Sequence, residues 1–319
     1  MHRRQLLKAA SAVGLGLGGA GRQARGRLSG RSSDLPHQQP ETGVKPRMDY
    51  IFFSKMLQQQ SIEELIGSLR LIGADGVDLT VRPGYPVEPD NVAQTLVPAA
   101  QAIRAAGLSV PMITTPGDLT SPSLPYTEAL FAACGEAGIR LVKLGYWQFT
   151  GEGYWAGVEQ MKRDLVGLAE IGARYGVKPC LHTHSGNCFA LNAGCMMHVL
   201  QSFAPEQAGA YLDPGHLAVC GEPLPMAFDM TKEYLSMVAI KDMIKRKDDQ
   251  GRIRIEALWL GAGVVDWPEM MRWLVAHDFQ GPLSFHSEFE SDSTEHLLDQ
   301  TKKDIAYLRA TEAQVRASA

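Results

Sequence analysis

The 319-residue chain has few cysteines, and they form none of the patterns typical of disulfide or zinc scaffolds. The five cysteines are odd in number and include no Cys-x-x-Cys pair. This absence argues against a disulfide framework and against a cysteine-based zinc site. We expect Cys134 and Cys180, which lie in apolar runs, to be small core residues. Cys188 and Cys195 are close in sequence, so one optional bridge between them stays open.

A long apolar run is also missing near the N-terminus, where the small-residue stretch Ala9–Ala20 is too short and too rich in glycine to span a bilayer. We therefore expect no stable membrane insertion. A basic segment precedes this stretch, and its Arg3-Arg4 pair resembles a twin-arginine export signal. The pattern predicts a signal segment over residues 1–21 and export to the periplasm. No clean Ala-x-Ala cleavage site follows, so a cytoplasmic protein with a basic tail is the alternative.

Positive charge is scarce beyond the N-terminal region. Residues 1–47 carry nine basic and two acidic side chains, for a net charge of +7. The rest of the chain carries 22 basic and 33 acidic side chains, for a net charge of −11. An acidic body argues against nucleic-acid binding, which needs a basic face to meet phosphates. We expect a small-molecule partner, and the sequence leaves a homo-oligomer open.

Strand-like and helix-like segments alternate from Tyr50 onward. The predicted strands are short and apolar: Tyr50–Lys55, Gly76–Val81, Ser109–Thr114, Leu141–Tyr146, Lys178–His182, Ala208–Asp213, Met237–Lys241 and Leu283–Ser287. The predicted helices lie between and after them: Ser61–Ile72, Asn91–Ala106, Tyr126–Ala137, Tyr154–Tyr175, Gly194–Phe203, Pro225–Tyr234, Trp267–His277 and Thr294–Leu308.

Eight strand–helix units predict a (β/α)8 TIM barrel, an α/β fold, as a single domain. We place this barrel at residues 48–311, after a disordered linker at 22–47 that is rich in Gly, Ser, Pro, Gln and Arg. Residues 312–319 would form a C-terminal tail. A doubly wound open sheet is the alternative, but it calls for a Gly-rich phosphate loop after the first strand. Phe53-Ser54-Lys55-Met56 is not such a loop.

Four of the predicted strands end in clustered polar side chains. Their sequences are CLHTHSGN at 180–187, AYLDPGH at 210–216, MVAIKD at 237–242 and PLSFHSEFE at 282–290. The carboxyl ends of barrel strands share one face, where active sites of this fold lie. Because side chains alternate along a strand, His182 and His184 are expected on one side. Imidazoles and carboxylates from separate strands suit a divalent metal such as manganese, cobalt or zinc.

These segments also carry a family resemblance over about residues 49–309. It rests on five motifs in order: GVDLTVRPG at 76–84, LDPGH at 212–216, IKD at 240–242, GAGVVDW at 261–267 and GPLSFHSEFE at 281–290. The chain resembles the xylose isomerase-like TIM barrels, in the branch of sugar phosphate isomerases and epimerases. The resemblance implies a sugar or keto-sugar substrate and a divalent metal held at strands five to eight.

The family's ligand positions transfer only in part. Asp213 matches the aspartate ligand, and Glu288 matches the last glutamate ligand. His182 stands where the family has its first glutamate, and Ala239 where many members have a histidine. His184 could replace the lost imidazole, with His286 as another candidate. The predicted metal ligands are His182, His184, Asp213 and Glu288, and the predicted ion is manganese, with cobalt, zinc or magnesium as alternatives.

The resemblance also implies roles in catalysis. Family epimerases use two metal-bound glutamates as acid and base, and a metal-bound imidazole at His182 would be a poor substitute. We predict Glu288 as the base, with Lys241 or His216 as its acid partner. The predicted function is a metal-dependent sugar or keto-sugar isomerase or epimerase that works through an enediolate. The alternatives are a lyase or dehydratase on a keto-glycoside or cyclitol, and a non-catalytic carbohydrate-binding barrel.

Further side chains are candidates for substrate binding or support. The predicted substrate-binding residues are Arg82, Lys143, His286 and Trp147. For Arg82 and Lys143 an ion pair inside the protein is an equally open interpretation. We expect Asp242 to orient the site as a supporting carboxylate. The charged segment Lys245–Asp249 is expected to be a solvated turn.

Overall fold

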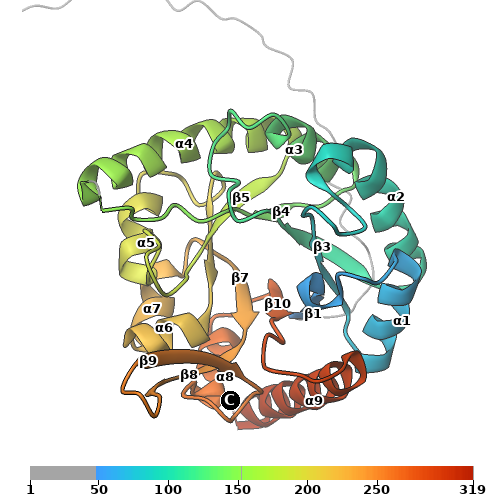
Figure 1. Cartoon of the computed structure of the whole chain (residues 1–319), viewed down its shortest axis with the longest axis vertical. Helices are drawn as coiled ribbons and strands as arrows, with labels where there is room; N and C mark the ends of the chain where they lie inside the picture. The colour runs from blue at the N-terminus through green and yellow to red at the C-terminus, as the bar shows by residue number, and fades with distance from the viewer. Residues whose placement is uncertain (1–47, 152, 319) are drawn as a thin grey trace, which may run out of the picture. The chain divides into compact units, whose positions relative to one another are not determined.

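Eight short parallel strands pair edge to edge and close into a barrel, which confirms the predicted fold (Figure 1). The computed structural model describes residues 48–151 and 153–318. The order of strands around the barrel is β1-β10-β7-β6-β5-β4-β3-β2. Their bounds are β1 Asp49–Phe53, β2 Gly76–Thr80, β3 Ser109–Thr114, β4 Leu141–Lys143, β5 Lys178–His182, β6 Gly209–Leu212, β7 Leu235–Ile240 and β10 Pro282–Phe285.

The helices form a ring around this barrel (Figure 1). They are α1 Ile62–Ile72, α2 Val92–Ala105, α3 Thr127–Glu136, α4 Tyr154–Tyr175, α5 Ala193–Leu200, α6 Pro214–Cys220, α7 Leu224–Thr231, α8 Trp267–Ala276 and α9 Thr294–Ser318, with short 3-10 helices η1 Ser54–Leu57 and η2 Pro89–Asn91. Local sequence sets the ends of α1. Ser61 and Glu64 form a capping box, and Gly73 ends the helix in a left-handed conformation with φ of 73°.

Two further strands form an antiparallel hairpin, β8 Asp242–Lys247 with β9 Ile253–Leu258. The expectation of a solvated turn at Lys245–Asp249 was therefore wrong for its first three residues, which lie in β8. The turn comes later, because the Asp248 carboxylate accepts hydrogen bonds from the backbone N–H groups of Gln250 and Arg252. Most of this hairpin is exposed, so it lacks the apolar run that predicts a buried strand.

The C-terminal boundary of the last helix lies later in the chain than predicted. Helix α9 continues to Ser318, so residues 312–318 extend that helix. The predicted signal segment at 1–21 and the linker at 22–47 lie outside the described residues. In the part of the chain that is described, no helix is long and apolar enough to cross a membrane.

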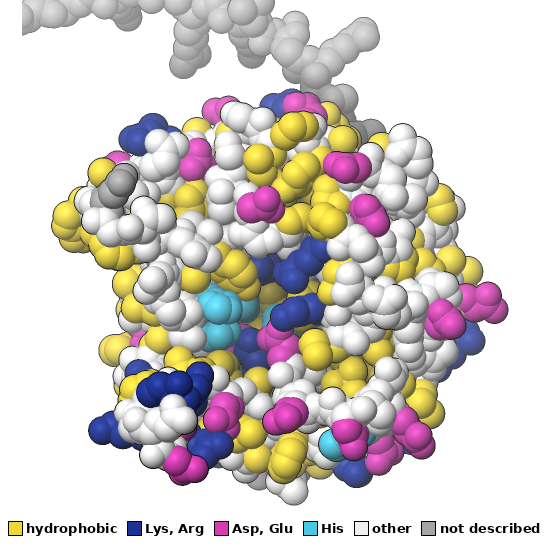
Figure 2. All heavy atoms as spheres, in the orientation of Figure 1, with side chains coloured by type: hydrophobic (Ala, Val, Ile, Leu, Met, Phe, Trp, Pro, Cys, Tyr) yellow, Lys and Arg dark blue, Asp and Glu magenta, His cyan; other side chains and the backbone are white. Residues whose placement is uncertain are grey.

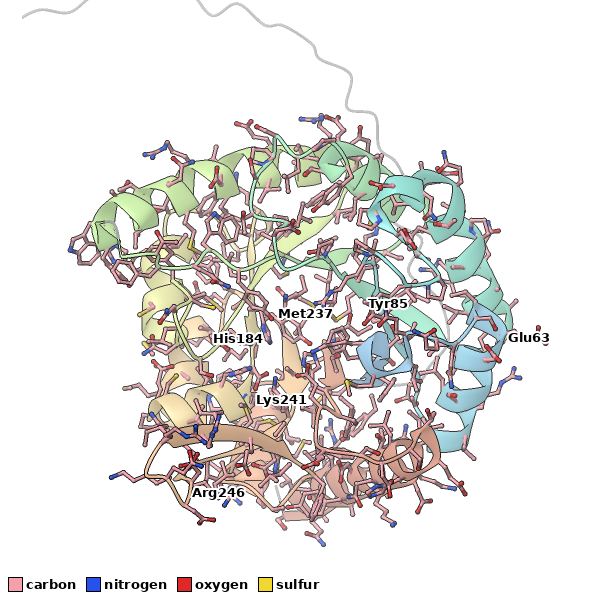
Figure 3. The ribbon with its side chains drawn as sticks, viewed as in Figure 1. Glu63, Tyr85, His184, Met237, Lys241 and Arg246 are labelled. Carbon is pink, nitrogen blue, oxygen red and sulfur yellow. The ribbon has the colours of Figure 1, made fainter. Side chains whose placement is uncertain are left out.

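The barrel interior explains where polar side chains gather. Below the carboxyl ends of the strands, the interior is filled by a separate hydrophobic cluster: Ile51, Met112, Cys180, Tyr211, Met237 and Ala239. Alternation puts the residue two positions further along on the same interior face. From Cys180, Tyr211 and Ala239 this step leads to His182, Asp213 and Lys241. Figure 3 shows Met237 and Lys241 near the centre of the barrel, with Glu63 and Arg246 at its outside. An apolar floor thus lies below a ring of polar side chains.

Gly215 allows helix α6 to pack closely on the end of β7. A Cβ atom there would lie 2.4 Å from the carbonyl oxygen of Lys241 and 2.8 Å from Cγ of Met243. We predict that Gly215→Ala lowers the free energy of unfolding by about 1–3 kcal/mol, since backbone must move to relieve the contact. Urea denaturation measures this loss.

The matched control is Gly67→Ala on the exposed face of α1, where no atom lies within 4 Å of the added Cβ. It should raise stability by about 0.5–1 kcal/mol, the usual gain of alanine over glycine within a helix. A Gly215→Ala protein as stable as the wild type would contradict the proposed packing constraint.

Candidate functional site

A cavity of about 120 Å³ opens at the carboxyl ends of the barrel strands. Lysine, arginine, histidine and acidic side chains gather in this central hollow (Figure 2). Its lining residues are Phe53, Lys55, Arg82, Thr114, Lys143, Tyr146, His182, His184, Lys241, His286 and Glu288. A larger hollow of about 390 Å³ between α8 and α9 has Arg272 as its one charged lining residue among those described. The groups capable of chemistry therefore lie in the smaller cavity.

His182, Asp213 and His286 form a buried cluster that could hold a metal ion, with ligand atoms all within 4.8 Å of one another. His182 Nε2 and Asp213 Oδ2 lie 3.6 Å apart. Within the described chain neither atom has a hydrogen-bond partner, although Lys241 Nζ is 3.4 Å from the carboxylate oxygen. Two ligands that bind one ion at about 2.0–2.2 Å can have such a separation. The donor set and its orphaned atoms therefore fit a divalent metal.

Two tyrosines that sequence reasoning missed hold these imidazoles in place. The Tyr146 hydroxyl lies 3.1 Å from Nδ1 of His182, and the Tyr211 hydroxyl lies 2.8 Å from Nε2 of His286. Contacts of this kind fix the ring orientation of metal-binding histidines. Tyr211 could have been found from the sequence, because it precedes Asp213 by two positions on the same strand face.

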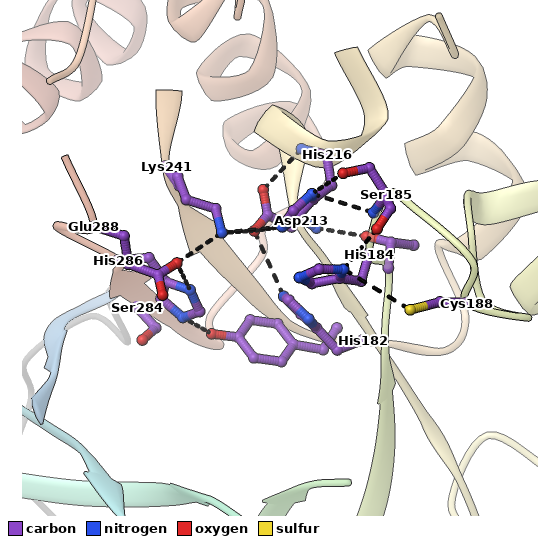
Figure 4. A network of polar contacts seen from close by, with 12 residues as sticks. His182, His184, Ser185, Cys188, Asp213, His216, Lys241, Ser284, His286 and Glu288 are labelled. Carbon is purple, nitrogen blue, oxygen red and sulfur yellow. Dashed lines mark hydrogen bonds and ion pairs between the residues drawn. The ribbon is translucent and has the colours of Figure 1, made fainter. Parts of the chain in front are cut away.

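Lys241 is the centre of the charged network (Figure 4). Its ammonium lies 2.8 Å from Glu288 Oε2, 3.4 Å from Asp213 Oδ2 and 3.0 Å from His216 Nε2. Burial lowers the pKa of Lys241, but the carboxylates of Asp213 and Glu288 outweigh burial and raise it. Lys241 is therefore an ammonium at neutral pH, positioned between two carboxylates.

Glu288 is ionised as well. Burial raises its pKa, but Lys241, His286 and Lys55 together lower it by more, and the net result is a pKa well below the usual value. Lys55 makes a second ion pair with Glu288. The side chain of Glu288 keeps 19% exposure at the cavity, so a ligand can reach this carboxylate.

His216 is neutral, because burial lowers its pKa to about 2 even though Asp213 opposes this shift. Nδ1 of His216 lies 2.8 Å from Oγ of Ser185 and 3.2 Å from its backbone N. The Lys241 ammonium, which has donors only, lies 3.0 Å from Nε2, so Nε2 accepts a hydrogen bond from Lys241 and the neutral ring carries its proton on Nδ1, where Ser185 Oγ can accept it. Nε2 also lies 3.7 Å from Asp213 Oδ2, so its lone pair faces the charged network.

Two other predicted site residues, His184 and Trp147, make contacts outside the cluster of His182, Asp213 and His286. His184 lines the cavity, but its Nδ1 contacts the Ser185 carbonyl oxygen at 2.8 Å and its ring packs on His216. Trp147 donates its indole N–H to Asp164 on α4 at 3.0 Å. The structure thus groups His286, rather than His184 or Glu288, with His182 and Asp213. The assignment of His184 and Glu288 as metal ligands stays a prediction, as does substrate binding by Trp147.

Asp242 supports the loop around the site. Its buried carboxylate accepts hydrogen bonds from the backbone N–H groups of Met243, Gly261 and Val265 and from the indole of Trp267, at 2.8–3.2 Å. These contacts account for two of the sequence motifs, because IKD supplies the carboxylate and GAGVVDW supplies three of its donors. The supporting role expected for Asp242 is therefore one of fixing the segment that follows β9.

Comparisons with known proteins agree with this fold. The family model for the xylose isomerase-like TIM barrel matches residues 68–311. No curated protein matches the sequence at a significant level. Many solved structures do match, mostly sugar epimerases and isomerases among those described, and with low sequence identity.

Three of these structures illustrate the range of chemistry. The 3-keto-D-glucoside 4-epimerase of E. coli shares 14% identity and a TM-score of 0.66, over 83% of this chain and 100% of that one. A probable 3-DHS dehydratase of Bacillus anthracis shares 14% identity and a TM-score of 0.64, over 82% and 99%. A xylose isomerase-like barrel of Mycobacterium smegmatis, in complex with magnesium, shares 14% identity and a TM-score of 0.60, over 83% and 98%.

The three-residue cluster predicts how metal affinity responds to mutation. His286→Ala should weaken binding of Mn²⁺ by about a hundredfold or more, since it removes a ligand where even a supporting residue costs about 10–100-fold. His184→Ala should leave the affinity nearly unchanged, because this side chain lies outside the cluster. Isothermal titration calorimetry of the purified protein with Mn²⁺ measures both.

His184→Ala is the matched control, since it also removes one cavity-lining imidazole. Equal losses in the two variants would show that the ligand set drawn from the structure is wrong. An unaltered affinity in His286→Ala, with a large loss in His184→Ala, would support the set predicted from the sequence instead.

Proposed function

The chain belongs to the xylose isomerase-like TIM barrel family, and from this premise we propose that it is a divalent-metal-dependent isomerase or epimerase of a sugar or keto-sugar. The observation that carries the proposal is the Lys241 ammonium, which lies between the carboxylates of Glu288 and Asp213 beside the cluster that could hold a metal. An ionised base and a protonated acid thus adjoin a place where a polarised carbonyl can bind.

The metal would be held by His182, Asp213 and His286, and manganese is the ion we propose. Cobalt, zinc and magnesium have compatible chemistry with nitrogen and oxygen ligands. When bound, such an ion would supply a positive charge that polarises a substrate carbonyl or hydroxyl. A solved relative holds magnesium, which supports a divalent ion in this fold without selecting one.

Proton movement is assigned to this chain's own side chains. Glu288, ionised and accessible from the cavity, would take the proton from the carbon next to the carbonyl. Lys241, 2.8 Å away, would return a proton at the neighbouring position, and it would stabilise the negative charge that develops on oxygen. His216, the other candidate for the acid, would accept a hydrogen bond from Lys241 at Nε2, 3.0 Å away, and hold this ammonium beside Glu288.

This arrangement favours isomerisation over epimerisation. Epimerisation by proton transfer needs an acid and a base on opposite faces of one carbon. Here Lys241 contacts both Glu288 and His216, so the three side chains form one continuous network. A contiguous network suits proton transfer on one face, as in an enediolate isomerisation.

A lyase or dehydratase is the second candidate. The Lys241 ammonium is an acid beside the Glu288 base, and elimination needs an acid to protonate the leaving oxygen. The similarity in fold to a probable dehydratase is compatible with this chemistry. A keto-glycoside or a cyclitol would be its substrate. If the proposed export signal at residues 1–21 operates, the substrate of either reaction is an unphosphorylated sugar met outside the cytoplasm.

Deuterium exchange tests the proposed function. Purified protein with Mn²⁺ is incubated in D2O with a panel of ketoses and keto-glycosides, and NMR follows loss of the C–H signal next to the carbonyl. We predict exchange with at least one substrate, reduced by about a hundredfold or more in Glu288→Gln, the range expected for loss of a general base.

Lys303→Met serves as a control for the handling of variants, because Lys303 is 66% exposed on α9 and pairs with Asp299. Exchange in this variant should equal that of the wild type. Binding of sugars without any C–H exchange or elimination would contradict the enzyme proposal and favour a carbohydrate-binding barrel.

A further inference from the structure

Lys143 is a buried lysine at the end of β4 whose ammonium has no hydrogen-bond partner within the described chain. The residue is 2% exposed, yet it lines the cavity. Its Nζ lies 3.7 Å from the centre of the Tyr146 ring, a cation–π contact that compensates a buried charge only in part. A desolvated ammonium without a hydrogen-bonded anion is costly, so a ligand that supplies one is expected to gain binding energy.

Arg82 lies in the same part of the cavity and also lacks an ion pair with any described residue of the barrel. Its Nε donates to the Thr115 carbonyl oxygen at 3.0 Å, and its guanidinium lies 5.7 Å from the ring centre of Phe53. The open interpretation of Arg82 and Lys143 as partners in internal ion pairs is therefore not what the structure shows.

The nearby acids are engaged elsewhere. Asp78 acts electrostatically on both cations, but its two oxygens accept hydrogen bonds from Thr114 and Ser284 at 2.7 and 2.9 Å. Glu288 is shared by Lys55 and Lys241. The cavity thus has one part whose charges are paired, around Glu288, and one part whose two basic side chains have no ion pair with a described residue.

We propose that the substrate is a sugar acid, whose carboxylate binds Lys143 and Arg82 while its carbonyl lies toward His182 and Asp213. The position of the carbonyl rests on the proposed function, whereas the anion site does not. The structure supplies the two basic side chains on β4 and directly after β2. In the closed barrel β4 lies across from β10, the strand that precedes Glu288, and β1 separates β2 from β10.

A carboxylate fits better than the alternatives. A neutral hydroxyl would leave the positive charge uncompensated. Phosphate sites of this fold lie at the loops after the seventh and eighth barrel strands, whereas Lys143 and Arg82 lie on β4 and after β2. Burial, and then the Arg82 guanidinium, hold the pKa of Lys143 well below its usual value, and a bound carboxylate would reverse part of this shift.

Three ligands that share one carbon skeleton separate these possibilities. D-fructose, D-fructuronate and D-fructose 6-phosphate carry a hydroxyl, a carboxylate and a phosphate at the same carbon. We expect isothermal titration calorimetry with the Mn²⁺-loaded protein to show that fructuronate binds about ten- to a hundredfold more tightly than fructose, the range of a buried hydrogen bond to a charged group. Lys143→Met should remove this preference, so that fructuronate and fructose bind the variant with nearly equal affinity.

Lys303→Met is again the control, and it should keep the full preference. The proposal is overturned if fructuronate has no advantage over fructose in the wild type, if fructose 6-phosphate binds more tightly than fructuronate, or if Lys143→Met retains the preference. Failure of C–H exchange with an intact uronate preference would refute the proposed reaction alone.

Thermal unfolding without any sugar provides a second, independent test. Burial of a lysine without a partner destabilises the ligand-free protein, so Lys143→Met should unfold at a higher temperature than the wild type. A lower unfolding temperature would show that Lys143 has a stabilising role within the fold, and it would overturn the proposal.

Discussion

The carboxylate of Asp213 is completely buried at the mouth of the barrel, and a buried charge is tolerated only when the fold surrounds it with compensating groups. One oxygen, Oδ1, accepts the backbone N–H of His216 at 3.1 Å and thereby caps helix α6. The other, Oδ2, faces His182, His216 and Lys241 at 3.4–3.7 Å. A single side chain therefore caps a helix with one oxygen and organises the site with the other. Much of the remaining geometry follows from these two roles.

Ion pairs that alternate in sign extend outward from the Asp213 carboxylate. Lys241 neutralises Asp213 and is itself shared with Glu288, which also meets Lys55. Neutral imidazoles complete the shell, because burial lowers the pKa of His182 to about 3. Elsewhere in the cavity, Arg82 and Lys143 have no such ion-pair partners among the described residues. This contrast between paired and unpaired basic side chains links the architecture of the site to the kind of substrate that it would accept.

The sequence predicted the barrel and the location of the site well, because both depend on local alternation. Apolar strands that end in His, Asp or Lys at regular spacing leave little freedom about the face on which these side chains meet. The choice between His184 and His286 could not be predicted in this way. Strand β5 ends at His182, so alternation no longer determines where His184 points, and its ring turns toward Ser185 and His216. The β8–β9 hairpin also escaped prediction, since its exposed charged residues lack an apolar face.

Anomalous diffraction from crystals of the protein grown with Mn²⁺ tests the central claim most directly. The account predicts one strong anomalous peak within bonding distance, about 2.0–2.3 Å, of His182 Nε2 and Asp213 Oδ2, with His286 as a third ligand and Lys241 still paired with Glu288. A peak bound by His184 and Glu288 instead, or no peak beside Asp213 at saturating Mn²⁺, would contradict it.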